Sequence, residues 1–187
     1  MDFLTNYLSD LRRALDELDL AIVMQMREAL QAAHRDQRQV FVIGNGGSAA
    51  LASHLAVDLG KCASHEGRPR WRVLSLTDNI PWMTALSNDI AYETVFVEQL
   101  KNYAQPGDVL LAISGSGNSP NILRAVEWAN EAGLTTLGLT GFRGGKLAPL
   151  AHHALIVPAM HMGRVEDGHL IVAHMLVYYF IEHPELS

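Results

Sequence analysis

The chain has 187 residues, of which 49% are hydrophobic and 18% charged, a balance that permits a compact core and excludes an intrinsically disordered protein. Its net charge of -6 argues against a general nucleic-acid-binding protein, although local backbone dipoles can still bind a small anion. The only cysteine, Cys62, excludes an intramolecular disulfide. The first residues lack the basic and then apolar layout of a signal peptide, and no apolar run approaches a membrane span. We therefore expect a soluble, cytoplasmic protein with no membrane partner.

The amino-terminal segment, residues 2–36, has the pattern of one or two amphipathic helices. Leucine and isoleucine recur there at steps of three and four residues, from Leu4 to Ile22, which places them on one helix face. Because this stripe precedes the first predicted strand, it must be buried on the rest of the domain or on another subunit, and we favour a subunit. Residues 1–36 are thus expected to be an oligomerisation segment within a single domain that covers residues 1–187.

Short apolar runs alternate with helical segments along the rest of the chain. This alternation is typical of a parallel sheet with helices on both faces. A final helix is predicted over about residues 164–183. The predicted strands are residues 39–44, 72–76, 108–114, 135–140 and 153–159.

A first glycine-rich loop, GNGGS at residues 44–48, directly follows the first predicted strand. Glycines allow the backbone to adopt positive φ and to approach a ligand, and Ser48 can cap the next helix or bond a ligand hydroxyl. In an open α/β sheet, ligands bind beyond the carboxyl ends of the strands. The alternative, of equal weight, is a tight strand-to-helix turn without a ligand.

A second loop, SGSGNSPN at residues 114–121, follows the third predicted strand. Its hydroxyls, glycines and helix start favour a bound anion, because free N–H groups and the helix dipole act together there. It has neither the lysine of a Walker loop nor the glycine spacing of a dinucleotide fingerprint. A phosphate monoester therefore fits better than a nucleotide, and the alternative is a capped helix with spare serines.

Further candidates follow the first two strands. His54 and Asp58 are four residues apart on the first helix after the GNGGS loop, so they are neighbours on one face that can share a proton or a metal ion. The alternative is a surface pair or a partly buried hydrogen bond. Asp78 follows the second strand and lies at the same edge, where it can also be a helix cap or a turn residue.

Together these stretches resemble the sugar isomerase (SIS) domain family, and within it the phosphoheptose isomerases, over about residues 1–183. The likeness rests on the ordered set GNGGSAA, His54-x-x-x-Asp58, LTDN…ALSND, GDVLLAISGSGNSPNI, LTG…GG and EDGHLIVAH. It implies a flavodoxin-like three-layer α/β fold with a five-stranded parallel sheet, and a homotetramer with active sites between subunits. The activity that it implies is conversion of sedoheptulose 7-phosphate to D-glycero-D-manno-heptose 7-phosphate through an enediol.

The resemblance also implies roles for individual residues. Asp58 is expected to be the general base and His174 the general acid. Some members of the family hold a zinc ion, and the matching residues here are His54, Asp58, Glu166 and His174. The substrate-binding residues that the resemblance implies are Asn45, Gly46, Gly47, Ser48, Asp78, Ser114, Gly115, Ser116, Ser119 and Glu166.

The chain departs from the family pattern at three of these positions. Asp58 stands where glutamate is usual, Glu166 where glutamine is usual, and Gly115 where threonine is usual. Two carboxylates with two histidines make a stronger set of zinc ligands. Two alternatives follow, an isomerase of another sugar phosphate and a non-catalytic phosphosugar-binding protein like the relative that binds the replication initiator. Retention of both histidines and of an acid at position 58 favours the enzyme.

The stretch EDGHLIVAH in the last predicted helix gives two different pairings. Asp167 and His174 are seven residues apart and lie almost on one face, whereas Glu166 lies about 80° from His174 around the helix. Spacing alone thus pairs Asp167 with His174, while the resemblance selects Glu166, and we follow the resemblance. Asp167 and His169 are expected at the rim of the site or at an interface.

Overall fold

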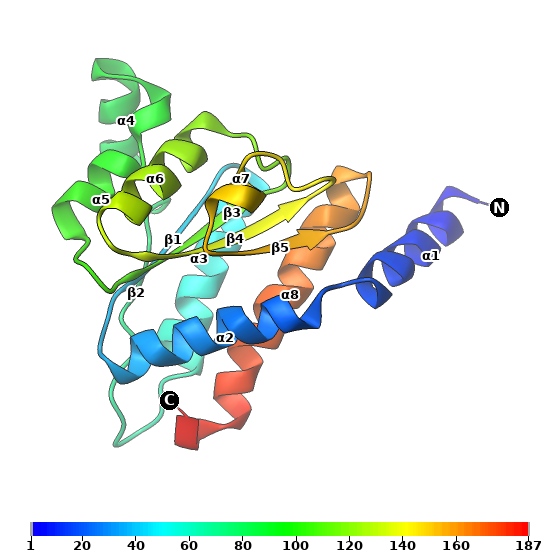
Figure 1. Cartoon of the computed structure of the whole chain (residues 1–187), viewed down its shortest axis with the longest axis horizontal. Coiled ribbons are helices and arrows are strands. Elements are labelled where there is room, and N and C mark those ends of the chain that lie inside the picture. The colour runs from blue at the N-terminus through cyan, green and yellow to red at the C-terminus, as the bar shows by residue number, and fades with distance from the viewer. Residues whose placement is uncertain (1, 187) are drawn as a thin grey trace.

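A computed structural model describes residues 2–186 of the chain (Figure 1). All five predicted strands are confirmed, each to within two residues. The strands are β1 (Val40–Gly44), β2 (Val73–Ser75), β3 (Val109–Ser114), β4 (Thr135–Gly141) and β5 (His153–Val157). The helices are α1 (Phe3–Asp16), α2 (Leu20–Arg35), α3 (Gly47–Val57), α4 (Ile80–Asp89), α5 (Val97–Tyr103), α6 (Pro120–Glu131), α7 (Leu147–Leu150) and α8 (Met162–Glu182).

The strands form one parallel sheet in the order β2-β1-β3-β4-β5. In its register, Val42 of β1 lies opposite Ser75 on one side and Leu111 on the other. The strand order reverses direction between β1 and β3, and ligands of such sheets bind in the crevice beyond the carboxyl ends at this point. The predicted flavodoxin-like sheet is therefore confirmed, and it places the two glycine-rich loops side by side.

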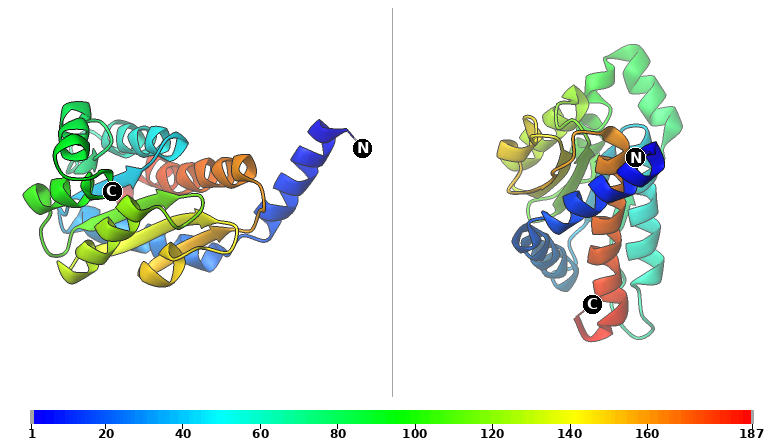
Figure 2. Two further views of the ribbon diagram at one scale, coloured as in Figure 1. Left: turned by 90° about the horizontal axis from the view of Figure 1, so that it is seen from above. Right: turned by 90° about the vertical axis from the view of Figure 1, so that its right-hand side faces the viewer.

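Helices cover both faces of the sheet, because its strands are apolar at successive positions (Figure 2). Val40 and Val42 pack with α2, α3 and α8 in one hydrophobic cluster, whereas Phe41 and Ile43 pack with α5, α6 and α7 in a second one. The result is the three-layer architecture that the sequence predicts. α3 and α8 contact each other on the first face, so residues more than a hundred positions apart meet there.

The predicted amino-terminal helical segment forms two helices, and Asp19 caps the second by accepting a hydrogen bond from the Ala21 backbone N–H. α1 points away from the sheet and contacts the start of α8 (Figure 1). There the Tyr7 hydroxyl donates to Asp167 Oδ2 at 2.6 Å, and Arg164 Nε donates to the Tyr7 carbonyl at 3.2 Å. None of the helices within residues 2–186 is long and apolar enough to cross a membrane.

Candidate active site

The GNGGS loop makes a turn that requires glycine at two positions. A Cβ on Gly44 would lie 2.4 Å from the Ser48 carbonyl oxygen, and Gly46 has a φ of 56°. Both conditions exclude ordinary side chains. The turn brings the start of α3, with the buried side chain of Ser48, directly over the carboxyl end of β1.

The serine loop after β3 forms a small pocket of about 160 Å³, which we call the serine pocket. Ser114 Oγ lies 3.3 Å from Ser119 Oγ, and Ser116 Oγ accepts a hydrogen bond from the Asn118 N–H at 3.2 Å. α6 begins beside these hydroxyls at Pro120. Ile113 of β3 and two residues of α8, Met162 and Glu166, also line the pocket. The lining residues from the two loops are Asn45, Ser48, Ser114, Gly115, Ser116 and Ser119.

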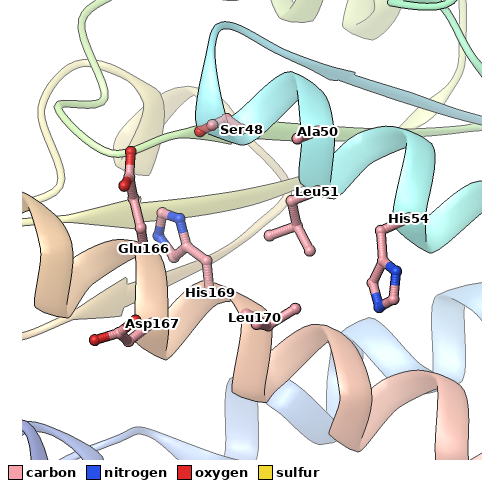
Figure 3. Close-up of a pocket in the computed structure, with 9 residues that line it drawn as sticks. Ser48, Ala50, Leu51, His54, Glu166, Asp167, His169 and Leu170 are labelled. Atoms are coloured by element: carbon pink, nitrogen blue, oxygen red, sulfur yellow. The ribbon is translucent and has the colours of Figure 1, made fainter.

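A larger pocket of about 330 Å³ lies between α3 and α8, and we call it the α3–α8 pocket (Figure 3). It shares Ser48 and Glu166 with the serine pocket, so the two pockets adjoin. A Cβ on Gly47 would lie 3.2 Å from Glu166 Oε1, which places this carboxylate against the first turn of α3, where the helix dipole favours a negative charge. The polar lining residues are Ser48, His54, Glu166, Asp167 and His169.

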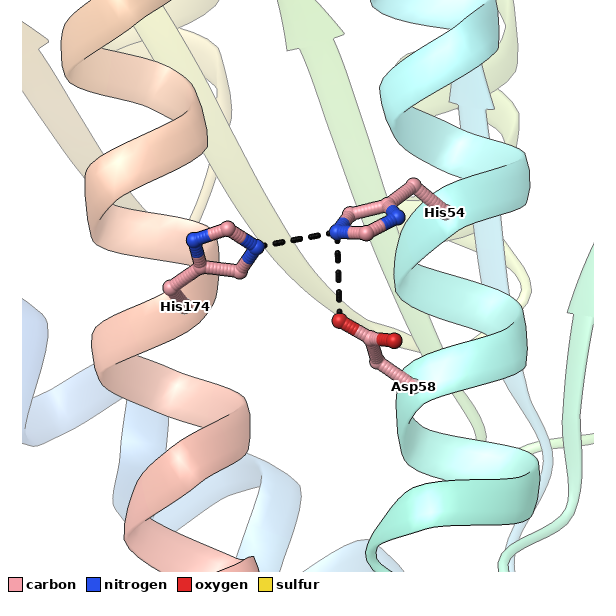
Figure 4. Close-up of side chains that lie close together, drawn as sticks. All are labelled: His54, Asp58 and His174. Carbon is pink, nitrogen blue, oxygen red and sulfur yellow. Dashed lines mark hydrogen bonds and ion pairs between the residues drawn. The ribbon is translucent and has the colours of Figure 1, made fainter.

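His54, Asp58 and His174 meet at the end of the α3–α8 pocket that His54 lines, and we call them the histidine cluster (Figure 4). His54 Nε2 lies 2.9 Å from His174 Nε2 and 3.2 Å from Asp58 Oδ2. Asp58 follows α3 and starts a π-helical turn, Asp58–Cys62, a feature that recurs at functional sites. Within residues 2–186, this is the one group of three or more histidine, cysteine, aspartate or glutamate side chains whose ligand atoms could meet on a metal ion.

The donor atoms of the histidine cluster fit a zinc ion. They all lie within 4.8 Å of one another. Two ligands of a tetrahedral Zn²⁺, each bound at about 2.1 Å, are about 3.4 Å apart, so small side-chain movements would bring the distances of 2.9 and 3.2 Å around His54 to this value. Three protein ligands with a fourth position for water or substrate are typical of catalytic rather than structural zinc sites.

The structure does not bring every predicted site residue together. Glu166, the fourth expected zinc ligand, lies over Gly47 and is not part of the histidine cluster. Asp78 lines neither adjoining pocket; it accepts a hydrogen bond from the Ser53 hydroxyl and lines a separate hollow beside β2. Gly46 also lines neither pocket, and its contribution is the turn itself.

The expectation that His169 lies at the rim of the site or at an interface is wrong. Its side chain is only 1% exposed, and neither ring nitrogen has a hydrogen-bond partner among the described residues. Burial of the ring disfavours its charged form and therefore lowers the pKa of His169. His169 follows Val165 by four residues and precedes Val172 by three, so the spacing of the buried stripe could have identified it.

Two residues near the loops carry contacts that the sequence pattern did not assign. Asn121, at the end of the SGSGNSPN loop, forms a reciprocal pair of amide hydrogen bonds with Asn45. Tyr92, from the 3-10 turn Tyr92–Thr94 after α4, donates its hydroxyl to Asn45 at 2.8 Å. Only the place of Asn121 in the loop indicated its contact, and no sequence feature indicated Tyr92.

Comparison with known proteins identifies the family. The chain matches the SIS domain family over residues 3–141. It is 39% identical over 180 residues to the phosphoheptose isomerase of Pelobacter propionicus, covering 94% of each chain, and 36% identical over 168 residues to that of Aquifex aeolicus, covering 90% of this chain and 87% of the relative. The structure of phosphoheptose isomerase GmhA from Neisseria gonorrhoeae superimposes with a TM-score of 0.87 at 28% identity, over 95% of this chain and 96% of that one. This chain therefore belongs to the SIS domain family.

Proposed function

We propose that the chain is a sugar-phosphate isomerase that converts sedoheptulose 7-phosphate to D-glycero-D-manno-heptose 7-phosphate. The observation that carries the proposal is the pair of adjoining pockets. One is lined by hydroxyls and lies at a helix start, and the other ends at His54, which lies within hydrogen-bonding distance of both His174 and Asp58. The relatives named as phosphoheptose isomerases support this choice of substrate.

The two pockets suit the two ends of such a substrate. The phosphate group would occupy the serine pocket, where Ser114, Ser116 and Ser119 offer hydroxyl donors and the α6 dipole attracts an anion. The sugar would extend into the α3–α8 pocket towards His54. Since Ser48 and Glu166 line both pockets, they would contact the middle of the substrate. The position of Glu166 thus supports its expected role in substrate binding over its expected role as a zinc ligand.

The histidine cluster can perform the proton transfers of an aldose–ketose isomerisation. Asp58 removes a proton from C1 of the ketose, and His174 donates a proton to the C2 oxygen, which gives the enediol. The Asp58 carboxyl group then returns its proton to C2, and His174 takes one from the C1 hydroxyl, so no oxidant or reductant is consumed. His54 lies between the other two groups, at 2.9 Å from one and 3.2 Å from the other, and it holds them in a fixed relation.

We propose that His54, Asp58 and His174 bind one zinc ion per subunit, which supplies Lewis-acid polarisation of the sugar oxygens when it is bound. The reason is the match between their spacing and that of zinc ligands. Metal analysis should therefore find zinc in the purified protein. Zinc should raise the thermal unfolding midpoint of the wild type and should not raise that of His174→Ala, because a ligand that binds only the folded state stabilises it. An equal shift in both proteins would contradict the assignment.

The oligomeric state belongs to the same proposal. We propose that residues 1–187 form one domain and that residues 1–36 join the chain into a homotetramer with sites between subunits. The support is the exposure of large apolar side chains, among them Phe3, Leu4 and Leu8 of α1. Light scattering should give a tetramer for the full chain and a smaller species for a Leu4→Glu, Leu8→Glu variant. A wild-type monomer would contradict this part.

The decisive experiment is a panel of sugar phosphates followed by NMR with the full chain. Sedoheptulose 7-phosphate should be turned over, and Asp58→Asn should lower kcat at least about 100-fold, because it removes the base while keeping its shape. Asp16→Asn, at the end of α1, is the matched control. Turnover of a different sugar phosphate alone would contradict the substrate assignment. Binding of phosphate esters without any turnover would replace the enzyme with a non-catalytic phosphosugar-binding protein.

A further inference from the structure

We propose that Asn45 binds the phosphate group purely as a hydrogen-bond donor, and that Asn121 and Tyr92 are positioning residues that fix this polarity. The inference rests on the proposed function, because that proposal assigns the serine pocket to phosphate. It makes the sequence-based expectation for Asn45, which was substrate binding, specific to the phosphate group.

A backbone N–H group, which can only donate, determines how the two asparagine amides are oriented. The Ile122 N–H faces the side chain of Asn121 at 3.0 Å, so the Asn121 atom there must be the amide oxygen. The other atom of the Asn121 amide is then nitrogen, a donor. Asn121 is only 2% exposed, so surrounding atoms hold the amide in this orientation and water does not compete for it.

The orientation of Asn121 determines that of Asn45. Asn121 Nδ2 donates to Asn45 Oδ1 at 2.8 Å, and Asn45 Nδ2 donates back to Asn121 Oδ1 at 2.9 Å. Tyr92 adds its hydroxyl to the same Asn45 oxygen at 2.8 Å, and this hydroxyl must act as the donor because it faces an oxygen. The two lone pairs of Asn45 Oδ1 are thereby both used. What Asn45 still offers is its second N–H.

The composition of the serine pocket makes this polarity important. Asn45 lines it together with Ser114, Ser116 and Ser119, and no described lining residue is lysine or arginine. The one charged lining residue is Glu166, an acid. Within one subunit, a phosphate dianion would therefore be held by neutral donors and the helix dipole, and an amide oxygen turned towards it would repel it. A donor fixed in advance avoids the cost of reorienting the amide when the ligand binds.

The same contacts join the two loops of the site. Asn45 follows β1 and Asn121 lies in the first turn of α6 after β3, 76 residues later, so their amide pair spans the point where the strand order reverses. A change at Asn121 or Tyr92 is therefore expected to act on phosphate binding at one end of the site. The proton transfers at the histidine cluster should be unaffected.

The test measures binding of inorganic phosphate by ³¹P NMR or calorimetry, which does not require turnover. Tyr92→Phe removes only the hydroxyl of a half-exposed side chain and is expected to fold normally. It should weaken phosphate binding about threefold to tenfold, the effect of one lost hydrogen bond. It should raise KM for the sugar phosphate by the same factor and leave kcat unchanged, a split that a general structural defect would not give. Tyr179→Phe is the matched control. Tyr179 lies on α8 outside the serine pocket, and its hydroxyl accepts a hydrogen bond from Arg27 of α2.

Two substitutions at Asn45 test the donor itself. Asn45→Ala should weaken phosphate binding about tenfold, and Asn45→Asp, which turns an oxygen to the ligand, about 100-fold or more. Unchanged phosphate affinity in Tyr92→Phe would overturn the positioning role, and unchanged affinity in Asn45→Ala would overturn the donor role. A wild-type protein that binds phosphate but turns over no sugar phosphate would contradict the proposed function alone.

Discussion

The serine pocket and the histidine cluster are the two ends of the candidate site, and they are built in opposite ways. Loops that directly follow β1 and β3 form the serine pocket, with hydroxyls, glycines and a helix start. Side chains of α3, the π-helical turn after it and α8 form the histidine cluster, and His54 and His174 lie 120 residues apart. The first end suits a phosphate, which many substrates share, while the second end carries the groups that can move protons. Local backbone geometry therefore supports binding, and long-range packing of helices supports chemistry.

The contacts within each end also differ. His54 touches both other members of its cluster, so removing any one of them disturbs the rest. In the serine pocket, Ser116 bonds within its own loop and Ser114 contacts Ser119 more loosely at 3.3 Å. Substitutions are therefore expected to act as a unit in the histidine cluster and by separate increments in the serine pocket.

The largest expected effect tests whether the histidine cluster acts as a unit. His54→Ala and His174→Ala should each lower kcat about 1,000-fold, in the range of lost general acid–base catalysis, and the double variant should lose little more. Steady-state kinetics on the substrate found in the NMR panel measures this. His183→Ala, after the end of α8, serves as the matched control. A double variant that loses the product of the two single effects would show that the histidines act independently.

A smaller effect is expected in the serine pocket at Gly115, where the family usually has threonine. A Cβ there would lie 2.5 Å from Met162 Sδ, so the methionine occupies the space of the missing side chain. Gly115→Thr should destabilise the fold by about 1–3 kcal/mol and weaken phosphate binding, because the crowded atoms must move. Denaturant unfolding and phosphate titration measure the two changes.

The paired variant separates crowding from a backbone effect at Gly115. Met162→Ala in the Gly115→Thr background should restore both stability and phosphate binding, since the new side chain would then have room. Met160→Ala, at an exposed position just before α8, is the control and should restore neither. Failure of the Met162 variant to rescue would mean that the contact with the methionine is not the cause.

The sequence predicts one end of the site far better than the other. The apolar strands and the loops that follow them are local features, so the sheet, the GNGGS turn and the serine loop are all found from sequence pattern. Gly44 illustrates this, because the turn itself leaves no room for a Cβ. His54 and Asp58 are predicted as neighbours by their spacing of four. His174 joins them only through the packing of α3 on α8, and the family resemblance, not periodicity, identified it.

The misplaced residues have physical causes of the same kind. Glu166 lies more than two turns from His174 along α8, and the helix start of α3 attracts its carboxylate away from the histidines. Asp78, after β2, accepts a hydrogen bond from Ser53 of α3. No local sequence pattern encodes this contact between two elements. A polar residue type at position 169 indicated exposure, whereas packing of α8 against the sheet buries it. Each outcome depends on which element a side chain meets after folding.

The smallest expected effect at neutral pH concerns His169, which lines the α3–α8 pocket between the two ends. Its ring is buried without partners, so His169→Leu should change the free energy of unfolding by no more than about 1 kcal/mol at pH 7.5, where the loss of an unpartnered polar group offsets repacking. Burial lowers the folded-state pKa of His169 below its unfolded value of about 6.5. As the pH falls through 6.5 towards the folded pKa, the unfolded chain takes up a proton that the folded chain does not. The wild type therefore loses up to about 1.4 kcal/mol per pH unit that the variant keeps.

Urea unfolding of both proteins at one fixed concentration, from pH 7.5 down to pH 5, measures this difference. Burial also lowers the pKa of His34, but that group is common to both proteins and cancels in the comparison. The variant should thus gain stability over the wild type as the pH falls below 6.5. Parallel stability curves would mean that water or a ligand partner reaches the His169 ring in solution and that the space between the two ends is polar. A widening gap would establish that a neutral, desolvated imidazole lies between the serine pocket and the histidine cluster.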